Sequence, residues 1–253
     1  MSAALSGLLL LDELTGGFKD GELIILGGRP GMGKTSFALR LLEMSGIEQK
    51  ENCLMQSFET SSSLLARHLY ALRTRFFCVL DKQEDEISAF RARYIDNGPV
   101  WIDDAPEGSL DKLSEKWRSL RAEHDLKFII IDYLQLIVSP GGLNSCLSQL
   151  KAIAQELSLP IIVLAQLNRT ADGRTDKRPI ITDLCGIDDV EAVDKILFLY
   201  REDYYKNPEM ERCSITEFIL AKHPEGKTGT VKIPHFFTAE YFLLYDLYGE
   251  KHD

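Results

Sequence analysis

The chain has 253 residues, of which 45% are hydrophobic and 27% are charged, so it is long enough to build one large core. Its formal net charge of −10 excludes a protein that coats nucleic acid through bulk positive charge. No apolar run is long enough to cross a bilayer, and the five cysteines lack metal-ligand spacing. We therefore expect a single domain over residues 1–253, in a reduced cytoplasmic compartment and without a membrane partner.

After a lead-in segment (residues 1–20), the first patterned region predicts a strand, a loop and a helix. Residues 22–26 form a short apolar run that is typical of a buried parallel strand. Residues 36–44 carry apolar side chains at helical spacing. The loop between them fits G-x-x-x-x-G-K-[ST], the phosphate loop of nucleoside triphosphatases, through Gly28, Arg29, Pro30, Gly31, Met32, Gly33, Lys34 and Thr35.

The residue types in this loop suit a nucleoside triphosphate. Glycines let the backbone fold tightly enough for successive N–H groups to surround the α- and β-phosphates. Lys34 can reach the β- and γ-phosphates, and the Thr35 hydroxyl can bind Mg²⁺. The positive end of the helix that begins near Ser36 adds to the attraction. A chance glycine-rich turn would not require the flanking strand and helix, so we predict nucleotide binding.

The rest of the chain alternates strand and helix patterns, which predicts an α/β fold with a mostly parallel sheet covered on both faces. Shorter strands around turns near the C-terminal end predict an antiparallel addition to that sheet. The predicted strands cover residues 53–58, 99–102, 128–132, 160–165, 195–200, 215–221, 229–233 and 241–245. The predicted helices cover residues 64–72, 81–97, 109–120 and 143–157, with a polar loop at 168–182.

Three predicted strands end in a polar residue, and the carboxyl ends of parallel strands line the ligand crevice of such a sheet. Asp132 follows four apolar residues and is the expected carboxylate on the Mg²⁺ side. Glu59 is the candidate general base that would deprotonate the attacking water. Gln166 could bind the γ-phosphate and report its presence to the next loop. The alternatives are a turn residue for Asp132, a solvated loop acid for Glu59 and no specific role for Gln166.

Several segments resemble the ATPase domain of DnaB-type replicative helicases, in that family's order and over nearly the whole chain. They are residues 16–35, 131–136, 166–169, 176–179, 182–184, 200–205, 221–222 and 228–231. The resemblance implies a RecA-like fold and an ATPase of DNA replication that uses ATP with Mg²⁺. It also implies a hexameric ring of identical chains that unwinds DNA while moving on single-stranded DNA. By the same resemblance, Arg201 belongs to the nucleotide-binding residues and Lys222 to the catalytic residues.

The sequence departs from this family at places that matter for the activity. We expect a chain without the family's N-terminal collar domain and without the linker helix that contacts the neighbouring subunit. Where the family usually reads Lys-Gln-Arg-Asn-Gly, residues 222–226 read Lys-His-Pro-Glu-Gly. Pro224 therefore stands at the position of an arginine that acts on the neighbouring subunit, an interaction worth roughly a thousandfold in rate. His223 is the nearest alternative donor.

Two segments that face DNA in the family also differ. Residues 139–145 are shorter than the family's basic segment, and residues 185–189 replace an Arg-Glu-Ser-Gly sequence. The consecutive Asp188 and Asp189 would repel a phosphate backbone. The remaining basic cluster would be either a DNA contact or a solvated loop, and consists of Arg169, Arg174, Lys177 and Arg178.

These observations leave more than one function open. The first is a DnaB-like ATPase and helicase. The second is a degenerate DnaB paralogue that binds nucleotide and acts through a protein partner, such as a replication protein, without unwinding DNA. A small-molecule kinase is a poorer third reading, because such enzymes share the phosphate loop but are not expected to combine it with Glu59, Gln166 and the segment from Lys222 to Gly229.

Overall fold

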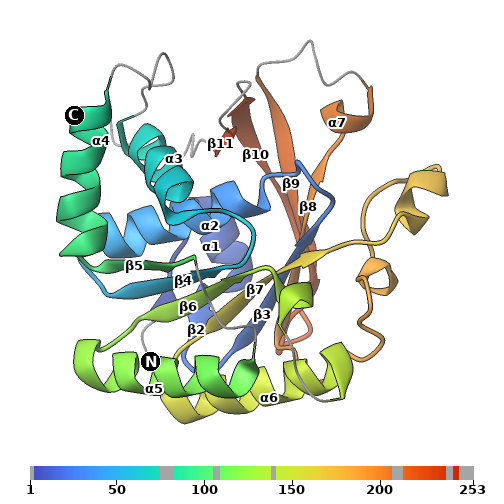
Figure 1. Cartoon of the computed structure of the whole chain (residues 1–253). Coiled ribbons are helices and arrows are strands. Elements are labelled where there is room, and N and C mark those ends of the chain that lie inside the picture. Colours follow the sequence, from blue (N-terminus) through green and yellow to red (C-terminus); the bar gives the residue numbers. More distant parts are fainter. Residues whose placement is uncertain are drawn as a thin grey trace.

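The computed structural model describes residues 3–74, 83–104, 109–137, 141–206, 213–237 and 242–244. A nine-stranded sheet runs through the molecule in the order β11-β10-β9-β8-β3-β7-β6-β4-β5 (Figure 1). The parallel strands are β3 (Leu23–Gly28), β4 (Cys53–Ser57), β5 (Val100–Asp103), β6 (Phe128–Asp132), β7 (Ile161–Gln166) and β8 (Lys195–Arg201). The antiparallel strands are β9 (Cys213–Lys222), β10 (Gly229–Phe237) and β11 (Phe242–Leu244). The predicted fold class is confirmed.

Helices cover both faces of the sheet, which explains why its central strands are apolar throughout. On one face lie α1 (Leu9–Thr15), α2 (Lys34–Leu41), α3 (Ser62–Thr74) and α4 (Glu84–Arg91), and on the other lie α5 (Leu110–His124) and α6 (Gly142–Leu157) (Figure 1). Along β3, Ile24 and Leu26 belong to the core on the first face, and Leu23 and Ile25 to the core on the second. A strand buried on both sides shows a continuous apolar run rather than alternation.

The lead-in segment is folded, although the sequence predicted no element there. It forms two short paired strands, β1 (Ala3–Ala4) and β2 (Phe18–Lys19), on either side of α1. Leu8 and Leu11 are completely buried. Strands of two residues and a helix of seven are too short for a periodic pattern, so packing rather than local sequence defines this segment.

Some element boundaries also differ from the prediction. The helix predicted from residue 36 is α2, which continues as a π-helical segment over Leu42–Glu48. The helix predicted over residues 81–97 corresponds to α4 and to the π-helical segment Ala92–Asp96 that follows it. Residues 81 and 82, where the predicted helix begins, lie outside the described part. A short helix, α7 (Asp203–Lys206), was not predicted. Within the described ranges, every helix is too short or too polar to cross a membrane.

Candidate functional site

The carboxyl ends of four parallel strands meet at one edge of the sheet. Gly28 at the end of β3 pairs with Gln166 at the end of β7. Asp132 at the end of β6 pairs with Leu164 on one side and with Ser57, at the end of β4, on the other. The topology therefore brings the start of the phosphate loop, Asp132 and Gln166 together, as the sequence predicted for a ligand crevice at this edge.

The phosphate loop leaves β3 and enters α2 directly. Gly31 and Gly33 have φ angles of 76° and 95°, in the left-handed region that favours glycine. Pro30 is exposed, whereas Met32 is buried, so the side chain of Met32 points into the core and only its backbone can face a ligand. Ser36 lies in the first turn of α2, where free backbone N–H groups attract anions.

Lys34 lies across the loop that it belongs to. Its Nζ donates hydrogen bonds to the carbonyl oxygens of Gly28 at 2.8 Å and Arg29 at 3.2 Å. Burial lowers the pKa of Lys34 from 10.5 to about 8, and the nearby Asp132 and Glu59 carboxylates only partly oppose that effect. The lysine is therefore held in an under-solvated position, from which it can transfer its hydrogen bonds to phosphate oxygens.

Thr35 and Asp132 form the other half of the site. The Thr35 hydroxyl donates to Asp132 Oδ2 at 3.0 Å, and Asp132 is only 3% exposed. Burial and the charge of Glu59 raise the pKa of Asp132, against the opposing effects of the Thr35 hydrogen bond and Lys34. The pair supplies hard oxygen ligands of the kind that Mg²⁺ takes alongside water and phosphate oxygens. Among the described residues, no group of three or more His, Cys, Asp or Glu that could hold a metal ion occurs.

Glu59 lies just beyond β4 and faces the same space. It lies within a turn in which Ser57 Oγ donates to the Thr60 carbonyl at 2.7 Å and accepts from the Thr60 N–H at 3.1 Å. Its side chain is exposed, and its charge acts on the pKa of both Lys34 and Asp132. A carboxylate so placed is able to accept a proton from water beside the phosphate loop.

Arg201 is a buried residue that supports the phosphate loop by a hydrogen bond to its backbone. It ends β8, is 3% exposed, and donates from Nη1 to the Gly31 carbonyl at 3.1 Å. Asp203 holds its guanidinium through Nε, at 3.4 Å, and through Nη2. Sequence reasoning missed Asp203 as a site residue. Asp203 follows Arg201 by two residues and lies within a segment that resembles the family, and these two facts could have indicated it as a site residue.

Arg29 and Gln166 connect the phosphate loop to the segments beside it. Arg29 donates from Nη1 to the Leu167 carbonyl at 3.1 Å and from Nη2 to Asp172 Oδ2 at 3.2 Å. Tyr205 also donates to Asp172, at 3.3 Å. The backbone of Gln166 exchanges hydrogen bonds with the Gln135 side chain, at 3.3 and 3.4 Å. Arg29 is therefore tied to the loop after β7, an attachment that spacing alone did not predict.

Comparison with known proteins identifies the family. The family model of the DnaB-like helicase C terminal domain matches residues 4–243. The chain belongs to this family. It is 36% identical over 254 residues to the replicative DNA helicase DnaB of Geobacillus stearothermophilus, covering 93% of this chain and 55% of the relative. It is 33% identical over 252 residues to the replicative DNA helicase DnaC of Bacillus subtilis, with the same coverage. The chain thus spans about half the length of these relatives.

Two solved structures agree with this assignment. One, an ATPase domain, is 30% identical, with a TM-score of 0.78 over 96% of this chain and 91% of that chain. The other, a DnaB-like replicative helicase solved to study its interactions with primase, is 27% identical with a TM-score of 0.80 over 96% of this chain and 62% of that one. The RecA-like fold implied by the sequence resemblance is therefore that of a DnaB-like ATPase domain.

Lys222 lies at the opposite edge of the sheet from the phosphate loop of this DnaB-like domain. It ends β9, which runs antiparallel to β8, and pairs with Ile196 near the start of β8. Its Nζ donates to the Val190 carbonyl at 2.6 Å. The structure therefore does not bring Lys222 together with Lys34, Asp132 and the other site residues of its own chain.

The histidine that follows Lys222 offers no free ring nitrogen to replace the family's arginine. His223 is buried; its Nε2 lies 3.2 Å from the Thr15 carbonyl, and its Nδ1 accepts from the Glu225 N–H at 3.1 Å. Both ring nitrogens are occupied within the chain, so His223 is unsuited to the donor role that the sequence suggested. Pro224 is exposed at the turn that follows.

The basic cluster in the loop after β7 is mostly committed to internal contacts. Arg174 pairs with Asp183 through two hydrogen bonds of 2.8 and 2.6 Å, and Arg178 pairs with Glu217 through two of 2.7 Å. Lys177 Nζ lies 4.7 Å from the centre of the Tyr205 ring, and Arg169 is exposed. Arg174 therefore closes the loop on itself and Arg178 ties it to β9, so these two arginines are paired within the chain rather than free in a solvated loop.

The two altered segments are described in part. Residues 138–140 lie outside the described ranges, so only the end of segment 139–145 is placed, where α6 begins at Gly142. In segment 185–189, the N–H groups of Asp188 and Asp189 donate to Asn144 Oδ1 at 3.3 and 3.4 Å. The two segments therefore lie against each other, and the consecutive aspartates remain exposed.

Proposed function

We propose that this domain binds ATP with Mg²⁺ and hydrolyses it, as the ATPase domain of a ring-forming replicative DNA helicase. The observation that carries the proposal is the convergence of Lys34, Thr35 and Asp132 at one sheet edge, with Glu59 facing them. Membership of the DnaB-like family, whose replicative helicases it matches over about half their length, favours this function over a paralogue without unwinding activity and over a small-molecule kinase.

Each residue takes a defined role in this proposal. Backbone N–H groups of residues 28–36, except Pro30, bind the α- and β-phosphates. Lys34 exchanges its bonds to backbone carbonyls for bonds to the β- and γ-phosphates. Thr35 and Asp132 would hold Mg²⁺, which supplies positive charge beside the transferred phosphoryl group. A Glu59 carboxylate oxygen takes a proton from the attacking water. Gln166, which pairs with Gly28 in the sheet, would contact the γ-phosphate.

The far edge of the sheet fits a role towards a second copy of the chain. Lys222 and Pro224 lie away from their own phosphate loop, so they reach a phosphate only if identical chains associate head to tail, as in a ring. Single-stranded DNA and a replication protein are the further partners that we propose, in a reduced cytoplasmic compartment. Because proline cannot supply positive charge, we expect slow hydrolysis.

Replacing Pro224 with arginine is expected to raise ATP hydrolysis per chain by about tenfold or more, against the roughly thousandfold that a natural arginine finger supplies. Pro224 is exposed, so an arginine there can extend into a neighbouring chain. The rate should be measured across a range of protein concentrations, with light scattering to follow association. Glu225→Arg, which adds a positive charge one residue away, is the control. Equal rates for both variants in the associated state would contradict the proposed contact.

The affinity for ATP is expected to fall as pH rises above about 8, approaching about tenfold per pH unit. Lys34 has a pKa of about 8 in the free protein, so at higher pH it loses the proton that phosphate binding requires. Dissociation constants between pH 7 and 9.5, measured with a fluorescent ATP analogue, test this. Lys34→Arg should give a flat profile because arginine keeps its charge. A flat wild-type profile would show that Lys34 does not govern binding.

Steady-state ATP hydrolysis with and without single-stranded DNA tests the function as a whole. Stimulation by DNA that is lost in Lys34→Ala would support a DNA-dependent ATPase. Hydrolysis that requires Lys34 but ignores DNA would retain the ATPase and overturn the helicase assignment. An activity that Lys34→Ala leaves unchanged would come from a contaminant, so hydrolysis by this chain would have to be rejected.

A further inference from the structure

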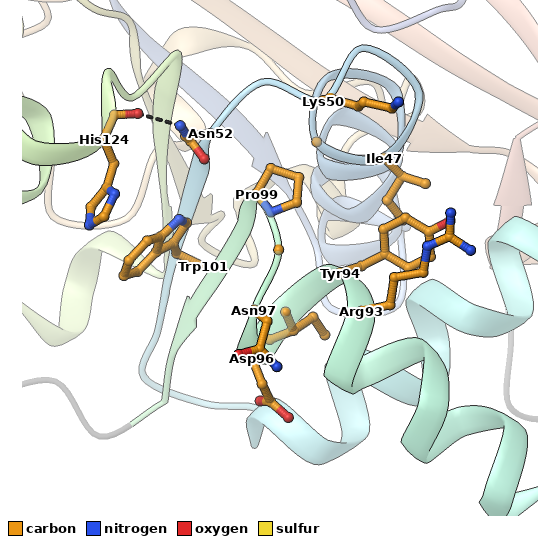
Figure 2. A pocket seen from close by; sticks show the side chains of 13 residues that line it. Ile47, Lys50, Asn52, Arg93, Tyr94, Asp96, Asn97, Pro99, Trp101 and His124 are labelled. Carbon is orange, nitrogen blue, oxygen red and sulfur yellow. Dashed lines mark hydrogen bonds between the residues drawn. The ribbon is translucent and has the colours of Figure 1, made fainter.

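A cavity of about 630 Å³ lies far from the phosphate loop, where β4 and β5 begin (Figure 2). The two π-helical segments form one side of it, through Ile47 in the first, with Lys50 just after that segment ends, and through Arg93 and Tyr94 in the second. Trp101 and His124 line it as well. We call it the Trp101 cavity. Because parallel strands begin at the edge opposite to the phosphate loop, the Trp101 cavity is separate from the proposed ATP site.

The walls of the Trp101 cavity are rich in aromatic groups. The rings of Trp101 and His124 lie with their centres 4.5 Å apart, and Tyr94 lies with Lys50 and Arg93 away from Trp101 (Figure 2). The indole N–H of Trp101 is buried, and within the described part of the chain it has no hydrogen-bond partner. A buried indole N–H normally has an acceptor, so the hydrogen bonding of Trp101 is left incomplete on this side of the cavity.

The charges around the cavity favour an anion. Lys50 and Arg93 line it, and neither forms an ion pair with any described residue; Arg93 instead lies 5.0 Å from the centre of the Tyr94 ring. The one acidic lining residue, Asp96, is neutralised by Arg91 at 3.2 Å. On a chain with a net charge of −10, two such cations beside aromatic rings form a locally positive, stacking surface.

We propose that the Trp101 cavity binds a nucleotide unit, with the base against Trp101 or Tyr94 and the phosphate at Lys50 and Arg93. Aromatic stacking surfaces next to cations are the means by which proteins bind bases without reading sequence. A volume of about 630 Å³ is also ordinary for a small-ligand site. The same chemistry is offered by a free nucleotide and by a unit within single-stranded DNA.

Tryptophan fluorescence tests this directly, because the chain has two tryptophans and only Trp101 lines the cavity. Trp117 is completely buried, and its N–H donates to Gln56 Oε1 at 3.2 Å, so it should not respond. The titration uses Lys34→Ala protein in EDTA, which disables the phosphate loop, with AMP and with a twelve-residue oligothymidylate as probes. We expect saturable quenching of Trp101 fluorescence by at least one probe. Quenching by AMP alone would identify a free nucleotide as the ligand, and quenching by the oligonucleotide alone would identify single-stranded DNA.

The double variant Lys50→Ala/Arg93→Ala should weaken that binding at least tenfold, and Lys227→Ala, an exposed lysine elsewhere, should not change it. Fluorescence polarisation of a labelled form of each probe provides a second readout, independent of Trp101, for the variant Trp101→Phe. Absence of quenching by both probes would overturn the proposal. Quenching that is unchanged in the double variant would overturn the proposal as well. An acidic peptide serves as a comparison probe, and quenching by that peptide but by neither nucleotide probe would also overturn it.

Discussion

Replacing Lys34 with alanine is expected to lower ATP hydrolysis by roughly a hundredfold to a thousandfold, the range for removing one preorganised donor from developing negative charge. The phosphate loop contains two cations, and Arg29 is already paired with Asp172. Among the described residues, the Nζ of Lys34 donates only to two backbone carbonyls, and it can exchange these hydrogen bonds for bonds to a phosphate. Alanine removes both the charge and the donor. Phosphate release at saturating ATP measures the change in turnover. Binding of a fluorescent ATP analogue measures the change in affinity separately.

The matched control is Lys19→Ala, which removes an exposed lysine whose weak pairing with Glu225 spans 3.8 Å. We expect wild-type hydrolysis from this variant. Thermal unfolding of both variants should be recorded, since a folded but inactive Lys34→Ala protein assigns the loss to the site. A folded Lys34→Ala protein that hydrolyses ATP at the wild-type rate would be incompatible with the proposed function.

Glu22→Gln is expected to lower the free energy of unfolding by about 3–5 kcal/mol, the cost of leaving a buried charge without its partner. Lys195 is completely buried at the start of β8, and its Nζ donates to Glu22 at 2.6 Å and to the Gly17 carbonyl at 2.7 Å. Burial lowers the pKa of Lys195, against the opposing effect of Glu22. Glutamine keeps the shape but removes the negative charge. Urea unfolding at pH 7 measures the loss.

A second substitution distinguishes charge from packing. In the double variant Glu22→Gln/Lys195→Met no buried charge remains, so most of the lost stability should return. Glu156→Gln serves as the control, because the Arg118–Glu156 pair is exposed and its loss should change stability little. If Glu22→Gln unfolds at the wild-type urea concentration, water must solvate Lys195 in the folded protein.

The sheet and the phosphate side of the site were predictable from the sequence because both depend on local pattern. Strands buried on two faces read as apolar runs, and parallel connection then places their terminal residues at a common edge. Asp132 and Gln166 were identified in this way without knowledge of any contact. The loop motif adds Lys34 and Thr35 through a spacing that needs no tertiary structure.

The contacts that local pattern could not predict join residues distant in the chain. Arg178 and Glu217 lie 39 positions apart, so nothing in the loop sequence indicated that this arginine was already paired. The hydrogen bond from Arg201 to the Gly31 carbonyl joins residues 170 positions apart, so the sequence near Arg201 could not indicate it. The placement of Lys222 could have been anticipated, because an antiparallel strand ends at the opposite edge from its parallel neighbours.

The position of β3 within the sheet has a consequence for how the site responds to stress. This strand is the fifth of nine, flanked by β7 and β8, and it carries the phosphate loop at its end. Local opening begins where backbone hydrogen bonds are fewest, at the outer strands β5 and β11. The outer strands β5 and β11 can therefore unfold locally while the phosphate loop keeps its conformation. Amide hydrogens in Leu23–Gly28 should exchange only when the whole domain unfolds.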